Sequence, residues 1–168
     1  MMHAQDVLDI TRCLDTAGIP VWLDGGWGID ALVGEQTRPH DDLDVVIALH
    51  DARNAQDALQ QRGFVLVEDA LPTRFVLRDE TDRRIDFHTV TFDAGGGGIQ
   101  QLQDGSCFRY PPEGFDGRGR VNARTVRCLT AEVQMLCHVG YTPDADDYHD
   151  VLLLHTRFGL ELPPPYHR

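Results

Sequence analysis

An acidic pair at the start of an apolar run is the feature that most restricts how this chain can fold. Asp42 and Asp44 flank Leu43 directly ahead of the run Val45-Val46-Ile47-Ala48. The run predicts a buried strand over residues 43–49, although acidic residues are poor strand formers. Side chains alternate along a strand, so the two acids should share one face while Leu43 and Val45 point into the core. Two carboxylates roughly 7 Å apart along one face repel each other unless a cation lies near them.

A second acidic strand lies further along the chain, in Arg84-Ile85-Asp86-Phe87-His88. The same alternation places Asp86 and His88 on one face. If this strand lies beside the first, Asp86 completes a cluster of three carboxylates, the oxygen ligands that Mg²⁺ prefers. Asp86 could then ligate the metal or accept a proton as a general base. His88 could orient a substrate or hydrogen-bond to Asp86, or it is an ordinary strand histidine.

Apolar periodicity and turn residues predict the remaining elements. Turns near Pro72 and over residues 79–82 separate extended segments that should be antiparallel neighbours, so we expect a mixed sheet. Helices are predicted over residues 6–17, 27–33, 51–62, 130–138 and 144–158, and further strands over 21–23, 64–67, 74–77 and 85–92. Residues 95–98 predict a hairpin tip or loop, and residues 104–124 predict loops with short strands.

The charge and the apolar content restrict the classes of partner. The chain has 27 acidic and 15 basic residues, for a net charge of -12. This charge argues against a nucleic-acid partner and favours a cationic small molecule, since phosphate contacts dominate nucleic-acid affinity. No apolar segment approaches the roughly 20 residues that span a bilayer, and the N-terminus lacks the regions of a secretory signal. We therefore expect no membrane partner and a cytoplasmic location, with the four cysteines reduced and packed as small hydrophobes.

All 15 basic residues are arginine, because the sequence contains no lysine. A bound phosphate would therefore need arginine, helix N-termini, backbone N–H groups or metal ions as its counter-charge. Gly25-Gly26 stands between a predicted strand and a predicted helix, where the backbone can approach a phosphate closely. Arg38 and His40 are the candidates in the loop that leads to the acidic strand, and Arg38 is the better one for a phosphate.

Two groups of acids outside the strands have less specific interpretations. Asp30 is either a partner of Arg38 or an acid on a helix surface. A group of Asp146, His149, Asp150 and His155 resembles a helical metal site at i, i+4 spacing, but no complete HExxH pattern is present. A solvated helix face is the better interpretation of this second group.

Taken together, the pattern resembles the small antibiotic nucleotidyltransferases of the DNA polymerase beta superfamily. The motif consists of Gly25-Gly26-Trp27, Asp30, Arg38-x-His40-x-Asp42-x-Asp44 and Ile85-Asp86-Phe87-His88. It is most similar to the lincosamide nucleotidyltransferases, with the aminoglycoside 2''-nucleotidyltransferases as relatives. The resemblance implies an α+β nucleotidyltransferase fold, with a mixed, mostly antiparallel sheet flanked by helices and a short C-terminal helical part. It also implies transfer of a nucleoside monophosphate from ATP or another nucleoside triphosphate to a drug hydroxyl, with two Mg²⁺ ions and release of pyrophosphate.

The resemblance also assigns roles by position. It implies that Asp42 and Asp44 bind metal, that Asp86 ligates metal or acts as the base, and that the triphosphate is held by Gly25, Gly26, Arg38 and His40. Aminoglycoside relatives often carry a lysine at the position of Asp146, and this departure favours the lincosamide branch. We expect residues 1–168 to form a single domain, with a catalytic core over about 1–93 and acceptor-side loops, strands and helices over about 94–168. A homodimer is compatible with the resemblance.

Alternative functions remain open at this point. The acceptor could be an aminoglycoside instead of a lincosamide. A glycosyltransferase also holds a divalent ion with a strand-end DxD motif, although it gives no reason for Gly25-Gly26-Trp27 and Asp86 at their spacings. An antitoxin-like relative would work through a protein partner, and intact Asp42, Asp44 and Asp86 argue against it.

Overall fold

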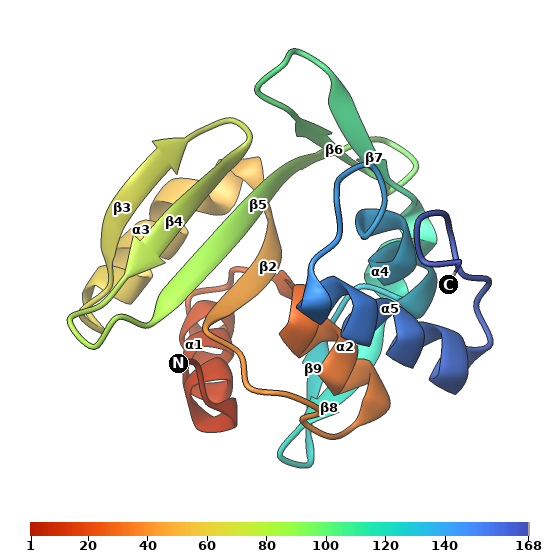
Figure 1. The fold of residues 1–168 in the computed structure, drawn as a ribbon. Helices are drawn as coiled ribbons and strands as arrows, with labels where there is room; N and C mark the ends of the chain where they lie inside the picture. The colour runs from red at the N-terminus through yellow and green to blue at the C-terminus, as the bar shows by residue number, and fades with distance from the viewer. Residues whose placement is uncertain (168) are drawn as a thin grey trace.

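The computed structural model describes residues 1–167. Its α-helices lie around one main sheet and a small separate hairpin (Figure 1). The helices are α1 (Ala4–Thr16), α2 (Gly25–Val33), α3 (Ala52–Gln60), α4 (Ala131–Cys137) and α5 (Ala145–Phe158). The strands are β1 (Val21–Asp24), β2 (Asp42–Ala48), β3 (Val65–Ala70), β4 (Arg74–Arg78), β5 (Arg84–Phe92), β6 (Gly98–Gln101), β7 (Cys107–Tyr110), β8 (Arg118–Val121) and β9 (Arg124–Arg127).

The main sheet has the order β1-β2-β5-β4-β3, and β6 and β7 extend it from the far end of β5. Only the pairing of β2 with β5 is parallel among its described strands; the other pairings are antiparallel. The crossover between β2 and β5 passes through α3, β3 and β4. The prediction of a mixed, mostly antiparallel sheet flanked by helices is confirmed.

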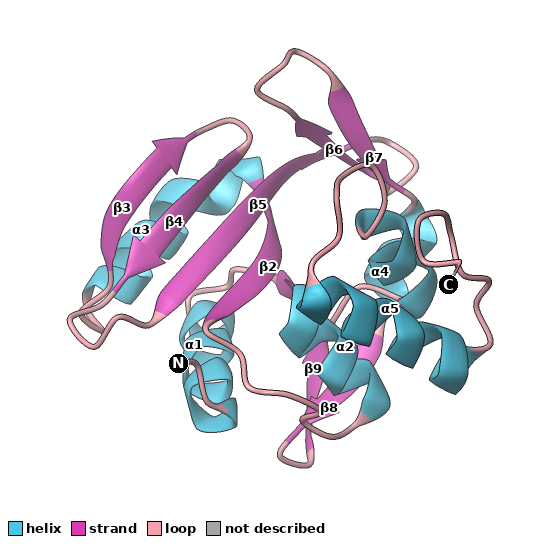
Figure 2. Ribbon diagram, viewed as in Figure 1, coloured by secondary structure: helices cyan, strands magenta, loops and turns pink. Residues whose placement is uncertain are grey.

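The two faces of the sheet have different environments. Leu43, Val45 and Phe87 are fully buried and belong to the main core, which also contains the apolar sides of α1 and α3. Figure 2 shows α3 behind β3 and β4 and α1 below the sheet, while α2, α4 and α5 form a second group to the right. Because side chains alternate, Asp42, Asp44 and Asp86 point to the face opposite the main core.

Several predicted boundaries require correction. The second helix begins at Gly25, two residues before the predicted start, so the glycine pair forms its first turn. Asp24 belongs to β1 and caps this helix. Residues 93–97 form the tip of the β5–β6 hairpin, which confirms that interpretation of the glycine run.

Cys107 is exposed, contrary to the expectation that all four cysteines are packed, and all four are free thiols. Among the described helices, none has the length and apolar character required to cross a bilayer.

A buried carboxylate holds the turn between β4 and β5. Asp79 accepts hydrogen bonds from Arg83 Nε at 2.7 Å and from the backbone nitrogens of Thr81 and Arg83. Burial alone would raise the pKa of Asp79, but these hydrogen bonds lower it below its ordinary value. Ionised Asp79 therefore stabilises the fold above its ordinary pKa of about 3.9, and this stabilisation is lost as the pH falls through the lower folded-state pKa.

We expect Asp79→Asn to lower the free energy of unfolding by about 1–3 kcal/mol near neutral pH, because Arg83 loses a charged partner. The difference from the wild type should shrink below about pH 4, where the wild-type carboxylate also becomes protonated. Urea unfolding near pH 7 and near pH 3 measures both quantities. Asp82→Asn in the same turn is the matched control, since Asp82 is exposed and asparagine tolerates its left-handed backbone. Equal losses in the two variants would contradict this account.

Candidate active site

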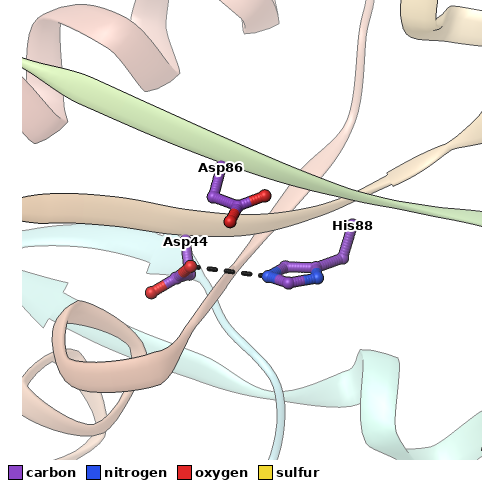
Figure 3. A group of neighbouring side chains, drawn as sticks. All are labelled: Asp44, Asp86 and His88. Carbon is purple, nitrogen blue, oxygen red and sulfur yellow. Dashed lines mark hydrogen bonds and ion pairs between the residues drawn. The ribbon is translucent and has the colours of Figure 1, made fainter. Parts of the chain in front are cut away.

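The two acidic strands lie side by side, as the sequence predicts. In the parallel register of β2 and β5, Asp44 is the partner of Asp86. Ligand atoms of Asp44, Asp86 and His88 lie within 4.8 Å of one another, and Figure 3 shows their side chains directed toward a common point. All three are half-buried. The topology therefore brings together residues that lie far apart in the sequence.

The hydrogen-bond partner of His88 is Asp44 and not Asp86, which was one of the alternatives from the sequence. His88 Nε2 lies 3.4 Å from Asp44 Oδ1. Burial alone would lower the pKa of His88, but the hydrogen bond to Asp44 and the charges of Asp44, Asp24 and Asp86 raise it to about 9. At neutral pH the ring is therefore an imidazolium that partly compensates the negative charge of the cluster.

Asp86 has an arginine partner that sequence reasoning missed. Arg74 on β4 donates from Nε to Asp86 Oδ1 at 3.2 Å and from Nη2 to Glu68 at 3.0 Å. Burial raises the pKa of Asp86 and the charge of Asp44 adds to this effect, while His88 and Arg74 oppose it. The antiparallel pairing of β4 with β5, which the turn residues indicated, is the signal that could have placed Arg74 near this strand.

Asp42 lies at the outer end of β2 and is not a member of the group of three. Its side chain is exposed toward a cleft, yet lost hydration and the charges of Asp44 and Asp86 raise its pKa to about 6. The protonation of Asp42 therefore depends on the charges of Asp44 and Asp86. Asp42 is available as a further ligand at the edge of the cluster.

The residues present fit a divalent cation. Asp44 and Asp86 supply carboxylate oxygens, which Mg²⁺ and Ca²⁺ prefer, and Asp42 adds another nearby. The His88 nitrogen is a less suitable ligand for Mg²⁺ than an oxygen. A Cβ atom on Gly25 would lie 2.7 Å from Asp44 Oδ2, so a side chain there would displace that carboxylate. Gly25 also has φ +57°, a backbone conformation that favours glycine.

The first turn of α2 forms one wall of the site. The Gly25 N–H is occupied by the carboxylate of Asp24, at 2.8 Å. A Cβ atom on Gly26 would lie 2.5 Å from His40 Nδ1 and 2.7 Å from Arg38 Nη2. The glycine pair is therefore explained by the close approach of Asp44, His40 and Arg38. The structure brings all four residues of the predicted phosphate-binding set together at this helix end.

Arg38 is clamped by acids of α5. Its Nε and Nη2 donate to the two oxygens of Asp150 at 3.0 and 2.7 Å, and its Nη1 donates to Asp146 at 3.0 Å. Burial would lower the pKa of Arg38, but Asp150 and Asp146 raise it. The prediction of a solvated helix face was wrong for Asp150, which is buried. Arg38 is available to a phosphate only from the side that these acids leave open.

Asp30 is a buried hydrogen-bond partner of His40 and not a surface acid, and its charge also helps to raise the pKa of Arg38, so the predicted link to Arg38 is electrostatic. Its Oδ2 lies 2.5 Å from His40 Nε2, and its Oδ1 accepts from Thr37 at 2.6 Å. Thr37 also lies 2.9 Å from His149 Nε2 on α5. Hydrogen bonds thus connect the loop between α2 and β2 to α2 and to α5. The Nδ1 side of His40 is directed toward Gly26.

We expect Arg38→Lys to lower the free energy of unfolding by about 1–3 kcal/mol, because an ammonium group cannot reproduce the two parallel hydrogen bonds to buried Asp150. Arg157→Lys is the matched control, since the Arg157–Glu35 pair is exposed. Urea unfolding of the two variants at low and high salt makes the comparison. A loss no larger in Arg38→Lys than in Arg157→Lys would show that the clamp contributes nothing to stability.

A cleft of ≈ 710 Å³ opens beside these residues, a size typical of small-molecule sites. Its lining combines many aspartates with apolar and aromatic residues, several of which come from the β6–β7 hairpin and the segment after α4. The aspartates are Asp24, Asp41, Asp42, Asp44, Asp144, Asp146, Asp147 and Asp150, and the apolar or aromatic residues are Trp27, Pro39, Leu102, Phe108, Tyr110, Cys137, Val139 and Tyr141. The cleft therefore suits a molecule with both a cationic group and an apolar part.

Comparison with a protein-family model gives a match over residues 6–154, to the family described as aminoglycoside-2''-adenylyltransferase. Among curated proteins, the chain is 28% identical over 133 residues to a lincosamide resistance protein of Staphylococcus haemolyticus, covering 79% of this chain and 82% of that one. It is 30% identical over 123 residues to a 2''-aminoglycoside nucleotidyltransferase of Klebsiella pneumoniae, covering 73% of this chain and 65% of that one. The chain thus spans slightly less than two thirds of this aminoglycoside relative.

Solved structures show the same fold. The lincomycin-bound lincosamide antibiotic adenylyltransferase LnuA superposes with a TM-score of 0.82 at 25% identity, covering 92% of this chain and 98% of that chain. ANT(2'')-Ia in complex with adenylyl-2''-tobramycin superposes with a TM-score of 0.73 at 24% identity, covering 93% and 89%. The prediction of a nucleotidyltransferase fold is confirmed.

Proposed function

Because this chain belongs to the aminoglycoside-2''-adenylyltransferase family, we propose that it transfers the nucleoside monophosphate of ATP to a hydroxyl of a cationic antibiotic. The acceptor that we propose is a lincosamide. The single observation that carries this proposal is the parallel pairing of Asp44 with Asp86 beside the first turn of α2. This pairing supports a site in which the carboxylates would bind metal and the neighbouring helix N-terminus would face a phosphate. A glycosyltransferase with a DxD motif is disfavoured by the family match.

The roles of the residues follow from their positions. Asp42, Asp44 and Asp86 would hold two Mg²⁺ ions, whose chemistry is to neutralise phosphate charge and to activate the acceptor hydroxyl. Gly25, Gly26, Arg38 and His40 would hold the triphosphate. Asp86 would take the proton of the hydroxyl, and its raised pKa suits a base better than that of an ordinary aspartate. The acceptor oxygen forms its bond to the α-phosphorus while the bond to the β-phosphate oxygen breaks and pyrophosphate leaves.

The lining of the cleft supports a lincosamide over an aminoglycoside. Phe108, Tyr110 and Val139 offer apolar contact to a hydrophobic part of the acceptor, while the aspartates attract its amine. The nearly complete coverage of the LnuA chain supports the same choice. An aminoglycoside remains the second candidate, because the many carboxylates of the cleft also suit a polycation. The homodimer, the cytoplasmic location and the single-domain organisation over residues 1–168 remain predictions.

The test is the rate of pyrophosphate release from ATP and Mg²⁺ in the presence of one lincosamide or one aminoglycoside at a time. We expect release with the lincosamide, and a kcat/KM at least about tenfold higher than with the aminoglycoside, the scale of a lost apolar contact in a pocket. A reaction without drug measures background hydrolysis. The reverse preference would assign the aminoglycoside as acceptor, and no release above background with either drug would contradict the proposed function.

A further inference from the structure

A second groove, of ≈ 490 Å³, lies between α1 and the β8–β9 hairpin. It shares no lining residue with the aspartate cleft. Figure 1 shows α1, β8 and β9 at the lower side of the molecule, whereas β6 and β7, which contribute to the cleft, lie at the top. Any ligand of this groove would therefore occupy a site of its own.

The lining of this groove is positively charged, although the whole chain has a net charge of -12. Four arginines and one acid, Asp15, line it, which gives 4 − 1 = +3. The arginines are Arg12, Arg118, Arg124 and Arg127. Four guanidinium groups around one groove repel one another unless anions compensate them, and a single carboxylate is too few.

The hydrogen bonds of these arginines show which donors are free. Arg127 donates to Asp15 Oδ1 at 2.9 Å, and Arg118 donates to the carbonyl oxygen of Gly117 at 2.7 Å. Arg12 and Arg124 are exposed, and their side chains make no hydrogen bond or ion pair with any residue among 1–167. Arg12 on α1 and Arg124 on β9 therefore line the groove from two sides, and their guanidinium donors are unused.

The remaining lining adds an apolar surface between the two walls. Leu8, Val21 and Val126 are aliphatic and buried, and they lie in the floor of the groove. Planar guanidinium forks match the oxygens of phosphate groups, and the volume lies in the range of small-molecule sites. We propose that this groove binds a phosphorylated small molecule, with its phosphate oxygens on Arg12 and Arg124 and its organic part on the aliphatic floor.

This proposal does not depend on the transfer reaction, and its test is done without divalent cations. The experiment titrates ADP, and separately pyrophosphate, into ¹⁵N-labelled protein in EDTA, where the aspartates of the cleft repel both anions. The backbone amide signals of Thr11 and Thr125 report on the groove, and those of Gly25 and Gly26 report on the cleft. The variant is Arg12→Gln/Arg124→Gln. Its matched control is Arg53→Gln/Arg62→Gln, which makes the same change of charge at two exposed arginines outside the groove.

We expect ADP to shift the groove signals, to bind more tightly than pyrophosphate, and to lose affinity at least about tenfold in Arg12→Gln/Arg124→Gln, as expected when charge-assisted hydrogen bonds are removed. The control should bind nearly as the wild type does. Equal weakening in both double variants would show non-specific attraction and overturn the proposal. Shifts confined to the cleft signals, or no shifts at all, would overturn it as well, and pyrophosphate binding as tightly as ADP would refute the part assigned to the aliphatic floor.

Discussion

Asp44→Asn should lower the rate of nucleotidyl transfer by about a thousandfold, the scale on which removal of one preorganised electrostatic group reduces catalysis. Asp44 is the central acid of the cluster: it contacts His88, pairs with Asp86 across the strands and lies against Gly25. Asparagine has nearly the same shape but no charge, so it should leave the fold intact. Steady-state pyrophosphate release with ATP, Mg²⁺ and a lincosamide measures the loss.

A second readout separates a local loss of charge from unfolding. Because Asp44 makes the largest contribution to the raised pKa of His88, with smaller ones from Asp24 and Asp86, that pKa should fall in Asp44→Asn, which NMR titration of the histidine ring can follow. Asp57→Asn on the exposed surface of α3 is the matched control and should leave both quantities unchanged. An Asp44→Asn variant that keeps wild-type activity would remove Asp44 from the reaction.

Asp86→Asn should reduce turnover by at least about a hundredfold, the scale of a lost general base. Arg74 already occupies Asp86 Oδ1, which leaves the other carboxylate oxygen for a metal or for the proton of the acceptor. A base and a ligand can be distinguished by the Mg²⁺ concentration that gives half-maximal rate. If Asp86 is a ligand, this concentration should rise in the variant; if it is only the base, kcat should fall at an unchanged Mg²⁺ requirement.

Asp57→Asn again controls for the change in surface charge. Full activity in Asp86→Asn would remove Asp86 from the mechanism, whichever role it was given. A fall in activity that is accompanied by an equal loss of folded protein would assign Asp86 a structural role, and circular dichroism of the same samples measures that loss.

The core of the site could be predicted from the sequence because its signals are local. Alternation along a strand determines which side chains share a face, and this alone placed Asp42 with Asp44 and Asp86 with His88. The turn residues after residues 64–67 and 74–77 indicated antiparallel neighbours, which the pairing of β3, β4 and β5 confirms.

The partners of Arg38, His40 and Asp86 could not be predicted in the same way. Asp150 lies 112 positions from Arg38, and no local pattern distinguishes a buried acid on α5 from a solvated one. The burial and the partner of Asp30 could not be predicted for the same reason, because both depend on the loop that places His40 beside α2. The apolar part of the cleft comes from short segments of the C-terminal half, whose pairing is set by tertiary packing and not by periodicity.

The role proposed for the Asp44–Asp86 cluster is to support transfer of a nucleoside monophosphate to a drug. The most direct measurement is mass spectrometry of a lincosamide incubated with ATP, Mg²⁺ and either the wild-type protein or Asp44→Asn. We expect the wild type to add the mass of one adenylate to the drug, and the variant to add almost none in the same time. An unmodified lincosamide with the wild-type protein, or equal modification by the variant, would contradict the account.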